Sequence, residues 1–342
     1  MTPTQEAELL DIQRTLIKSP LETDELTLVE KAIQAQHLSL QFVKDPRKPW
    51  AGPNRLSSRA LLIAGAFRAG KTYLAEYVIS RLPSFETQEG RIESRPVHVK
   101  ASSTFNIEQL GRNILDCTGN LPARSLGPTR TMERVGIRLG LKTPTMIHID
   151  EAQRLARPER VAPHRLLVEQ ERIFGYLRDI LDLAAWPVPI VLTGTADLLP
   201  VLEQKDLGFF REKMDTIYLE PMVLGRAKDR EDLASAVTGY PGKVGMTVDL
   251  AGTTQFYDRL IVATNYAKGL AFEVCRDAIL IAASEGRKIL TVEDFATYYT
   301  RKTGCVRQAN PFIASDWHRI DPTVLLAAVT GDKPLRIGEI RK

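Results

Sequence analysis

The sequence predicts an α/β fold, in which a parallel sheet is flanked by helices and followed by a smaller helical region. Short apolar segments alternate with segments whose apolar residues recur at helical spacing, and this alternation stops after Pro221. Such alternation favours a parallel sheet sandwiched between helices, because parallel strands need crossover connections that are usually helical. The five predicted strands span residues 60–64, 96–100, 145–150, 189–193 and 216–219.

Four regions are predicted along the 342 residues. They are an N-terminal helical extension and linker (1–50), the sheet-containing domain (51–221), a helical lid (222–303) and an irregular C-terminal tail (304–342). Thr291 is the expected N-cap of the last lid helix, with Asp294 at its third position, a near capping box. Helices are predicted at 73–82, 107–115, 165–185, 229–237, 254–268, 270–285, 291–302 and 321–329.

The most informative segment is a glycine-rich loop between the first predicted strand and the helix after it. It reads Gly65-Ala66-Phe67-Arg68-Ala69-Gly70-Lys71-Thr72. A GxxxxGKT pattern in the order strand, loop, helix is typical of a phosphate-binding loop. Its glycines let backbone N–H groups surround phosphate oxygens, and the helix N-terminus adds partial positive charge. Lys71 would reach the β- and γ-phosphates and the Thr72 hydroxyl would ligate Mg²⁺, so we expect the chain to bind ATP.

Two adjacent carboxylates, Asp150 and Glu151, follow the third predicted strand. Asp150 would lie near the Mg²⁺ held by Thr72, as the Walker-B residue. Glu151 would point at the γ-phosphate and orient or deprotonate the attacking water. An Asp-Glu pair alone is also common at a solvated helix start. Its place after an apolar strand, downstream of the glycine loop, favours the catalytic interpretation.

Two further elements, a threonine and an arginine, are predicted to complete a hydrolase site. The fourth predicted strand ends in hydroxyl side chains, and we expect one of them to hold the lytic water, with Thr195 favoured over Thr193. A threonine also suits a strand end for structural reasons alone. Arg211 ends a helix just before the fifth strand and could reach the γ-phosphate of a neighbouring subunit. The alternative for Arg211 is an ordinary surface arginine.

Composition and charge set bounds on the partners. The chain is 44% hydrophobic and 26% charged, with a formal net charge of +4, as in ordinary globular proteins. From Arg91 to Arg165 thirteen basic residues face seven acidic ones, which indicates a nucleic-acid footprint only if other features support it. The three cysteines are far apart and fit neither a zinc site nor a disulfide framework. No signal peptide and no apolar stretch of bilayer length are evident, so a cytoplasmic protein without membrane contact is expected.

Beyond the glycine loop, two strings of residues resemble AAA+ ATPases, and more narrowly the transposition ATPases TniB and TnsC. They are His148-Ile149-Asp150-Glu151-Ala152-Gln153-Arg154-Leu155 and Val191-Leu192-Thr193-Gly194-Thr195-Ala196-Asp197-Leu198. The resemblance covers roughly residues 40 to 300 and implies an AAA+ domain with a C-terminal helical lid. It also implies that the protein binds and hydrolyses ATP and assembles into rings or helical filaments on duplex DNA. Slow, assembly-coupled hydrolysis is expected, because the lid lacks the usual sensor arginine. Such proteins link a TniQ-like target selector to a DDE transposase of the TniA or TnsB type, and some belong to CRISPR-associated transposons.

The same resemblance implies where DNA would bind. Lys100 ends the second predicted strand, and residues 121–131 are expected to form a loop that contains Arg124, Thr129 and Arg130 but no acidic residue. In the AAA+ arrangement both segments face a central channel. There these side chains would contact phosphates, which position a protein without reading sequence. Each of the four residues taken singly is equally consistent with a solvated surface.

The chain departs from the AAA+ pattern in its lid. AAA+ lids often carry a sensor arginine early in a helix after a glycine, but Gly269 is followed here by Phe272 at that place. Arg276, one turn later, is a candidate substitute. Arg134 and Arg138, in the helix after residues 121–131, are expected to face solvent.

Two other functions stay open at the level of sequence. One is an AAA+ loader or remodeller acting in replication or secretion, which would need brisk stimulated turnover and a closed ring. The other is a signalling ATPase that never contacts nucleic acid and would show no salt-dependent affinity for duplex DNA.

Overall fold

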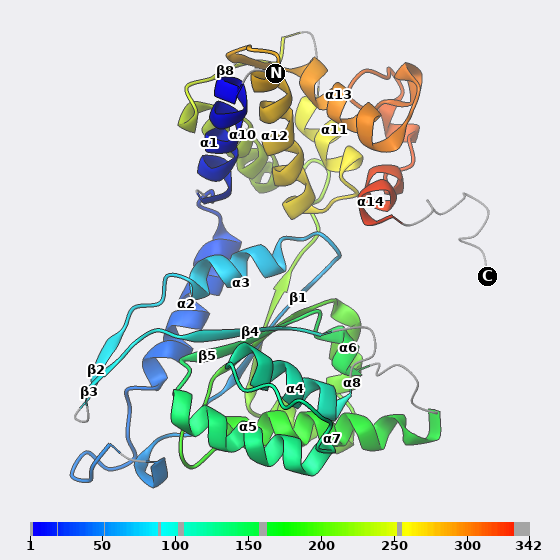
Figure 1. The fold of residues 1–342 in the computed structure, drawn as a ribbon. Helices are drawn as coiled ribbons and strands as arrows, with labels where there is room; N and C mark the ends of the chain where they lie inside the picture. Colours follow the sequence, from blue (N-terminus) through cyan, green and yellow to red (C-terminus); the bar gives the residue numbers. More distant parts are fainter. Residues whose placement is uncertain are drawn as a thin grey trace. The chain divides into compact units, whose positions relative to one another are not determined.

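The computed structural model describes residues 3–18, 20–50, 52–87, 90–101, 106–156, 163–251 and 255–331. The chain forms two compact units (Figure 1). The sheet unit comprises Asp24–Ala66 and Lys71–Leu219. The helical unit comprises Met1–Thr23, Phe67–Gly70 and Glu220–Lys342.

Five parallel strands make the sheet, in the order β4-β5-β6-β1-β7. The order is not sequential, because β6 inserts between β5 and β1. Register therefore pairs Thr193 of β6 with Asp150 of β5 on one side and with Ile63 of β1 on the other. The strands are β1 (Ala60–Gly65), β4 (Pro96–Lys100), β5 (Met146–Asp150), β6 (Ile190–Gly194) and β7 (Met214–Leu219).

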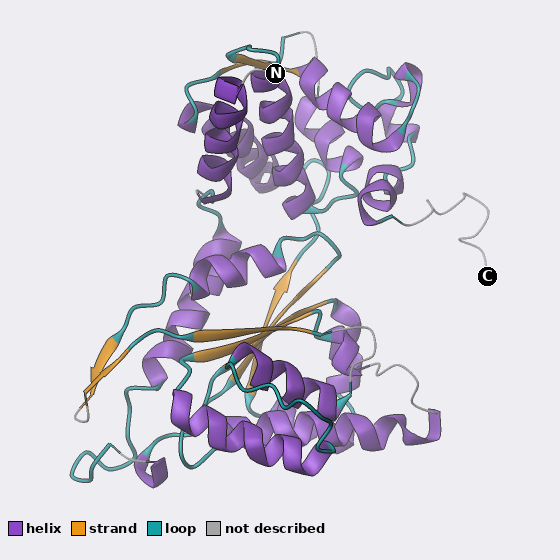
Figure 2. Cartoon of the chain, viewed as in Figure 1, coloured by secondary structure: helices purple, strands orange, loops and turns teal. Residues whose placement is uncertain are grey.

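Helices cover both faces of this sheet, as a parallel sheet requires. In Figure 1, α3 lies over one face and α4, α5 and α7 lie over the other, and Figure 2 shows the same layers by type of structure. Every residue of β1 and β6 is buried, and so are the first four residues of β5. The helices of this unit are α2 (Asp24–Ser39), α3 (Lys71–Ile79), α4 (Ile107–Cys117), α5 (Pro128–Lys142) and α7 (Pro163–Leu181).

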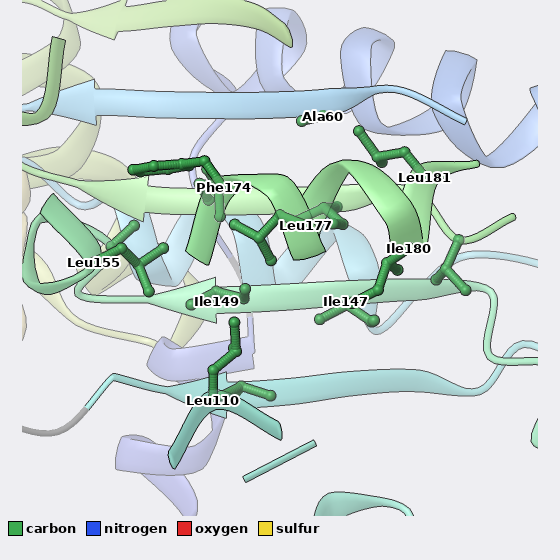
Figure 3. Packing of buried hydrophobic residues seen from close by; sticks show 14 of the residues in the cluster. Ala60, Leu110, Ile147, Ile149, Leu155, Phe174, Leu177, Ile180 and Leu181 are labelled. Atoms are coloured by element: carbon green, nitrogen blue, oxygen red, sulfur yellow. The ribbon is translucent and has the colours of Figure 1, made fainter. Parts of the chain in front are cut away.

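The hydrophobic core of the sheet unit forms where alternate residues of the strands meet α4 and α7. Ile147 and Ile149 of β5 pack there with Leu110 of α4 and Leu177 of α7, all almost fully buried (Figure 3). Because side chains alternate along a strand, His148 and Asp150 lie on the opposite face. The core thus orients the polar side chains of β5 toward the side of the sheet that α3 covers.

Short elements complete the sheet unit. A two-stranded antiparallel hairpin, β2 (Phe85–Thr87) with β3 (Gly90–Ile92), lies outside the main sheet. The remaining short helices are η1 (Gly52–Asn54), α6 (Gln153–Ala156), η2 (Ala196–Leu198), α8 (Leu199–Leu202), η3 (Lys205–Leu207) and α9 (Gly208–Arg211).

The helical unit has its own core, built from α1, the helices after Glu220 and a small parallel pair of strands. Lys268 is buried there and donates to Asp232 at 2.8 Å, with Asp229 at 3.7 Å. Its elements are α1 (Pro3–Lys18), α10 (Ala227–Lys243), β8 (Thr247–Asp249), α11 (Phe256–Ala263), α12 (Lys268–Ser284), β9 (Ile289–Thr291), α13 (Val292–Thr303), η4 (Arg307–Ala309), η5 (Trp317–Arg319) and α14 (Thr323–Thr330). Among the described residues, no helix combines the length and the apolar character that crossing a membrane requires.

The α/β architecture and the parallel sheet flanked by helices are confirmed, and each predicted strand lies within two residues of an observed one. The capping box at Thr291 and Asp294 is also present. The first 50 residues are divided between the units, since α1 belongs to the helical unit and α2 to the sheet unit.

Several predicted helices differ in their bounds, and in two segments the backbone gives the reason. The helix predicted for 254–268 ends at Ala263, because Asn265 and Tyr266 have φ angles of 50° and 60° that no right-handed helix accommodates. The loop predicted for 121–131 ends early, since α5 begins at Pro128, a residue whose fixed φ suits the first helical position. Thr129 and Arg130 therefore lie on the first turn of a helix.

Candidate active site

The glycine-rich loop Gly65–Thr72 joins β1 to α3 at the carboxyl edge of the sheet. Ligands in open parallel sheets bind at this edge. Within the loop, Arg68 has a φ of 59° and Gly70 a φ of 97°. A φ near 97° is open to glycine and strained for other residues, so Gly70 lets the chain turn before Lys71 begins the helix.

The middle of the loop, Phe67–Gly70, packs with α12 in the helical unit. The Leu270 amide donates to the Arg68 carbonyl at 3.0 Å. A Cβ on Gly269 would lie 2.5 Å from that carbonyl oxygen and 2.6 Å from the Gly70 nitrogen, both backbone atoms. The start of α12 therefore approaches the loop more closely than any side chain would allow.

Lys71 is curled over the loop. Its Nζ donates to the Ala66 carbonyl at 2.7 Å and to the Gly65 carbonyl at 3.2 Å. Burial lowers the pKa of Lys71, while the nearby charges of Glu151 and Asp150 oppose that shift. The amine of Lys71 thus lies close enough to both carboxylates for a favourable electrostatic interaction.

Asp150 is the point at which the glycine loop and the strand ends meet. Its Oδ1 accepts a hydrogen bond from the Thr72 hydroxyl at 2.8 Å and another from the Thr193 hydroxyl at 2.6 Å. Hydroxyl and carboxylate oxygens are the ligands that Mg²⁺ takes. Thr72 and Asp150, the two ligands that the sequence predicts, consequently offer a donor set that fits Mg²⁺.

Glu151 follows Asp150 in an unusual backbone conformation, with a φ of 58°. For a residue with a Cβ this left-handed conformation costs about 1–3 kcal/mol and persists only where the surroundings enforce it. Here the Gln153 amide group spans two neighbours: its Nε2 donates to Glu151 Oε2 at 2.7 Å, and its Oε1 accepts from the Thr195 amide at 3.2 Å. Gln153 thereby fixes the carboxylate of Glu151 relative to the end of β6.

The two candidate sensor threonines differ in their surroundings. Thr193 is fully buried and its hydroxyl donates to Asp150, as described above. Thr195 is half-buried, and its hydroxyl donates to the Asp197 carboxylate in the next helical turn. The structure therefore connects Thr193, which the sequence interpretation ranked second, directly to the predicted metal ligand.

His148 lies behind this network. Its Nε2 is 3.0 Å from the Thr193 hydroxyl and its Nδ1 is 3.2 Å from Nδ1 of His98. Burial, together with the charge of His98, lowers the pKa of His148 to about 4.

The sequence does not predict the contacts that three residues make in this hydrogen-bond network, namely Thr193, Gln153 and His148. The signal for His148 was present, since residues i and i+2 of a strand share a face and His148 precedes Asp150 by two. Thr193 and Gln153 required the strand register and the turn after β5.

The two candidate arginines make different contacts, Arg211 with a backbone carbonyl and Arg276 with an aromatic ring. Arg211, at the end of α9, is half-buried and donates to the Met214 carbonyl at 2.9 Å. Arg276 of α12 lies over the ring of Tyr240, with its guanidinium carbon 5.9 Å from the ring centroid. From the loop itself, Arg68 pairs with Glu273 of α12 at 2.8 Å.

The residues predicted to bind DNA are exposed. Lys100 ends β4, Arg124 lies in the loop before α5, and Thr129 and Arg130 lie on its first turn. The neighbouring stretch 102–105, which includes Ser102 and Ser103, lies outside the described residues.

Two further arginines of α5 bond to the segment that precedes them. Arg134 donates to the Asn120 side chain. Arg138 is only half-exposed and donates to the Thr118 carbonyl at 3.1 Å through Nε, so it braces the α4–α5 connection rather than facing solvent freely.

Comparison with known proteins agrees with this geometry. Residues 55–202 match the sequence model of an AAA domain. Three archaeal proteins have similar structures. Aeropyrum pernix ORC1, solved in complex with DNA, has a TM-score of 0.57 and 16% identity, over 87% of this chain and 70% of that one. Aeropyrum pernix ORC2, solved as ADPNP-ADP complexes, has a TM-score of 0.55 and 14% identity, over 83% and 71%.

Pyrobaculum aerophilum Cdc6p covers more of this chain, with a TM-score of 0.51 and 13% identity over 95% of this chain and 86% of that one. At these identities the likeness establishes the fold, which is that of AAA+ P-loop ATPases. No curated protein matches the sequence.

The close approach of α12 to the loop generates a stability prediction. Gly269→Ala places a methyl group against backbone atoms and should lower the free energy of unfolding of the helical unit by about 1–3 kcal/mol, the usual cost of overpacking. Chemical denaturation followed by circular dichroism measures this difference.

Gly175→Ala is the matched control, because a Cβ at this position in α7 would meet nothing within 4 Å. It should raise stability by about 0.5–1 kcal/mol, since alanine is the better helix former. Equal stability of the two variants would show that α12 does not hold the loop at the distance described.

Proposed function

We propose that this protein is an ATP-dependent regulator that assembles on duplex DNA, with the bound nucleotide setting its assembly state. The observation that carries the nucleotide part is the convergence of Thr72 and Asp150, whose side-chain oxygens are 2.8 Å apart although 78 residues separate them in sequence. This is the arrangement that a phosphate loop and a Walker-B carboxylate need around one Mg·ATP.

Binding of ATP is assigned to the loop Gly65–Thr72. Its backbone N–H groups and the N-terminus of α3 would surround the phosphates, and Lys71 would exchange its two carbonyl contacts for phosphate oxygens. Mg²⁺, when bound, would neutralise phosphate charge, and Thr72 and Asp150 would hold it. The ADPNP and ADP present in the ORC2 structure support nucleotide as the ligand of this fold.

Hydrolysis to ADP and phosphate is assigned to Glu151 as the base that orients and deprotonates water. Gln153 would keep its carboxylate aimed at the strand ends through the 2.7 Å hydrogen bond. Thr195 remains the proposed sensor of the lytic water, and Thr193 would position Asp150. Arg211 would act on the γ-phosphate of a neighbouring copy, which makes hydrolysis depend on assembly.

Binding of duplex DNA is assigned to Lys100, Arg124, Thr129 and Arg130. All four are exposed and lie in the stretch from Arg91 to Arg165 with thirteen basic and seven acidic residues. The ORC1 structure, which contains DNA, supports DNA as a ligand of this fold. Contacts from these side chains would go to phosphates and be independent of sequence.

The finer assignment is to DNA transposition. The strings around Asp150 and Thr195 that resemble TniB and TnsC support a protein that recruits a DDE transposase to a target selected by a TniQ-like partner. A replication-type loader is the second candidate, favoured by the structural likeness to ORC1, ORC2 and Cdc6p.

Electron microscopy with a non-hydrolysable ATP analogue and duplex DNA separates these two candidates. The transposition regulator predicts helical filaments or open rings with slow ATP turnover. A closed ring with brisk, DNA-stimulated turnover would favour the loader. Particles that stay monomeric on DNA would contradict both.

Glu151→Gln tests the catalytic assignment. Removing the base should lower the rate of hydrolysis by about 10²–10⁴-fold, the usual contribution of a positioned general base, while ATP affinity is retained. Assemblies on DNA should then persist longer, because release follows hydrolysis. Phosphate release, fluorescent-nucleotide binding and the lifetime of the assemblies measure these three quantities.

Glu203→Gln, at an exposed position after α8, is the control and should behave like the parent protein. If Glu151→Gln loses nucleotide binding as well, its role is structural and the catalytic assignment is wrong.

Charge reversal at Lys100 and Arg130 tests the DNA assignment. Lys100→Glu with Arg130→Glu should weaken binding equally on unrelated duplexes. It should also reduce the slope of log affinity against log salt by about 0.9 per lost phosphate contact. Fluorescence anisotropy at several salt concentrations measures both effects.

The control has the same change in net charge at two exposed lysines elsewhere, Lys205→Glu with Lys288→Glu. An altered sequence preference in the first variant, or an equal loss in the control, would contradict the assigned surface.

A further inference from the structure

We infer that Glu76, His98 and His148 form a second metal site, which takes a divalent transition metal, with zinc as the best fit. One ligand atom from each of these side chains lies within 4.8 Å of the other two. The site goes beyond the proposed function, because it is separate from the Mg²⁺ donors Thr72 and Asp150 and does not require nucleotide.

The topology of the sheet creates this cluster. His98 of β4 and His148 of β5 are direct partners in the register of two parallel strands, so their side chains leave the same face of the sheet. Glu76 comes from α3, the helix over that face, and both Glu76 and His98 are exposed. His148 is buried, with 1% of its surface accessible. The cluster thus has one buried ligand, His148, and two exposed ligands that ions can reach from solvent.

The hydrogen bonds around Asp150 determine which nitrogen of His148 carries the proton and which can bind a metal. A carboxylate accepts hydrogen bonds only, so the proton of the Thr193 hydroxyl points to Asp150. The Thr193 oxygen must then accept from His148, and we assign the proton of His148 to Nε2. Its Nδ1 consequently presents a lone pair, at 3.2 Å from Nδ1 of His98.

This arrangement has the form of a transition-metal site. Neutral imidazole nitrogens and a carboxylate oxygen are zinc ligands, and three protein ligands leave a fourth position open. Two nitrogens at about 2.0–2.1 Å from one tetrahedral ion would lie roughly 3.3–3.4 Å apart, so the observed spacing of 3.2 Å needs little adjustment to accept the ion. Mg²⁺ prefers oxygen ligands, so the two sites differ in the metals that they select.

The second nitrogen of His148 supports the same conclusion. Histidines that bind metals usually donate the other ring N–H to an oxygen acceptor, which fixes the tautomer and the orientation of the ring. Here the acceptor is Thr193, which in turn bonds to Asp150. A metal on His148 would therefore share one hydrogen-bonded chain with the proposed Mg²⁺ ligand.

Zinc binding to the purified full-length protein tests this site. Isothermal titration and equilibrium dialysis should be carried out without nucleotide and in excess Mg²⁺, which occupies the oxygen ligands. The parent for these measurements is Cys117→Ser, because Cys117 is exposed and its sulfur lies 3.0 Å from the His98 carbonyl oxygen. We expect one zinc ion per chain.

His98→Gln and Glu76→Gln alter exposed side chains and should leave the fold intact, as circular dichroism would verify. His98→Gln removes a ligand, so its zinc affinity should fall by more than the roughly 10–100-fold that loss of an outer-shell partner costs. Glu76→Gln should also weaken binding. His318→Gln, an exposed histidine of the helical unit, is the matched control and should bind like the parent.

Cobalt provides an independent readout of geometry. Bound Co²⁺ should give the strong visible absorption of a four-coordinate ion in the parent, and His98→Gln should lose it. Absence of zinc binding in the parent, or zinc affinities of His98→Gln and Glu76→Gln equal to that of the parent, would show that the two histidines are only a hydrogen-bonded pair and would overturn the proposal. These outcomes are distinguishable from failure of the proposed function, since no ATP is present.

Discussion

The carboxylate of Asp150 is the constraint on which the rest of the site depends. Two hydroxyl groups donate to the same oxygen of this residue, Thr72 from the start of α3 and Thr193 from β6. Hydrogen bonds to a charged acceptor are roughly twice as strong as those between neutral groups. These two hydrogen bonds connect the glycine loop to β5 and β6. They also position Lys71 and Glu151, because Lys71 adjoins Thr72 and Glu151 adjoins Asp150 in the sequence.

The strand order explains why three elements can meet at Asp150. In the order β5-β6-β1, the carboxylate at the end of β5 and the loop after β1 are separated by one strand. Thr193, the residue of β6 in register with Asp150, occupies that interval. Behind it, His148 closes the network on the face that α3 covers. A sequential strand order would put β5 and β1 at a different spacing and leave no place for a bridging hydroxyl.

Much of this arrangement was predictable from local sequence. The strand that ends in Asp150 and the strand that precedes the glycine loop are both apolar runs followed by polar or glycine-rich segments. Such patterns depend only on burial and on turn chemistry. The predicted helix at 254–268 was too long because left-handed backbone at Asn265 and Tyr266 interrupts it. Asn265 was the available signal, since asparagine adopts this conformation more readily than most residues. The start of α5 was missed although Gly127 and Pro128 are a typical helix start.

The contacts that tune the site could not be predicted, because they depend on register and on distant segments. Thr193 reaches Asp150 only because β6 lies beside β5, and their separation in sequence gives no indication of this. Gln153 holds Glu151 through a turn whose conformation is unusual for any residue with a Cβ. The pairing of His98 with His148 follows from the β4–β5 register and is invisible in either strand alone.

The central claim is that the loop Gly65–Thr72 and Asp150 hold one Mg·ATP between them. Isothermal titration of the purified protein with ATP, in the presence of Mg²⁺ and after its chelation, tests this most directly. We expect one ATP per chain, an affinity that falls when Mg²⁺ is removed, and loss of that metal dependence in Thr72→Ala. No affinity for ATP, or the same affinity with and without Mg²⁺, would contradict it.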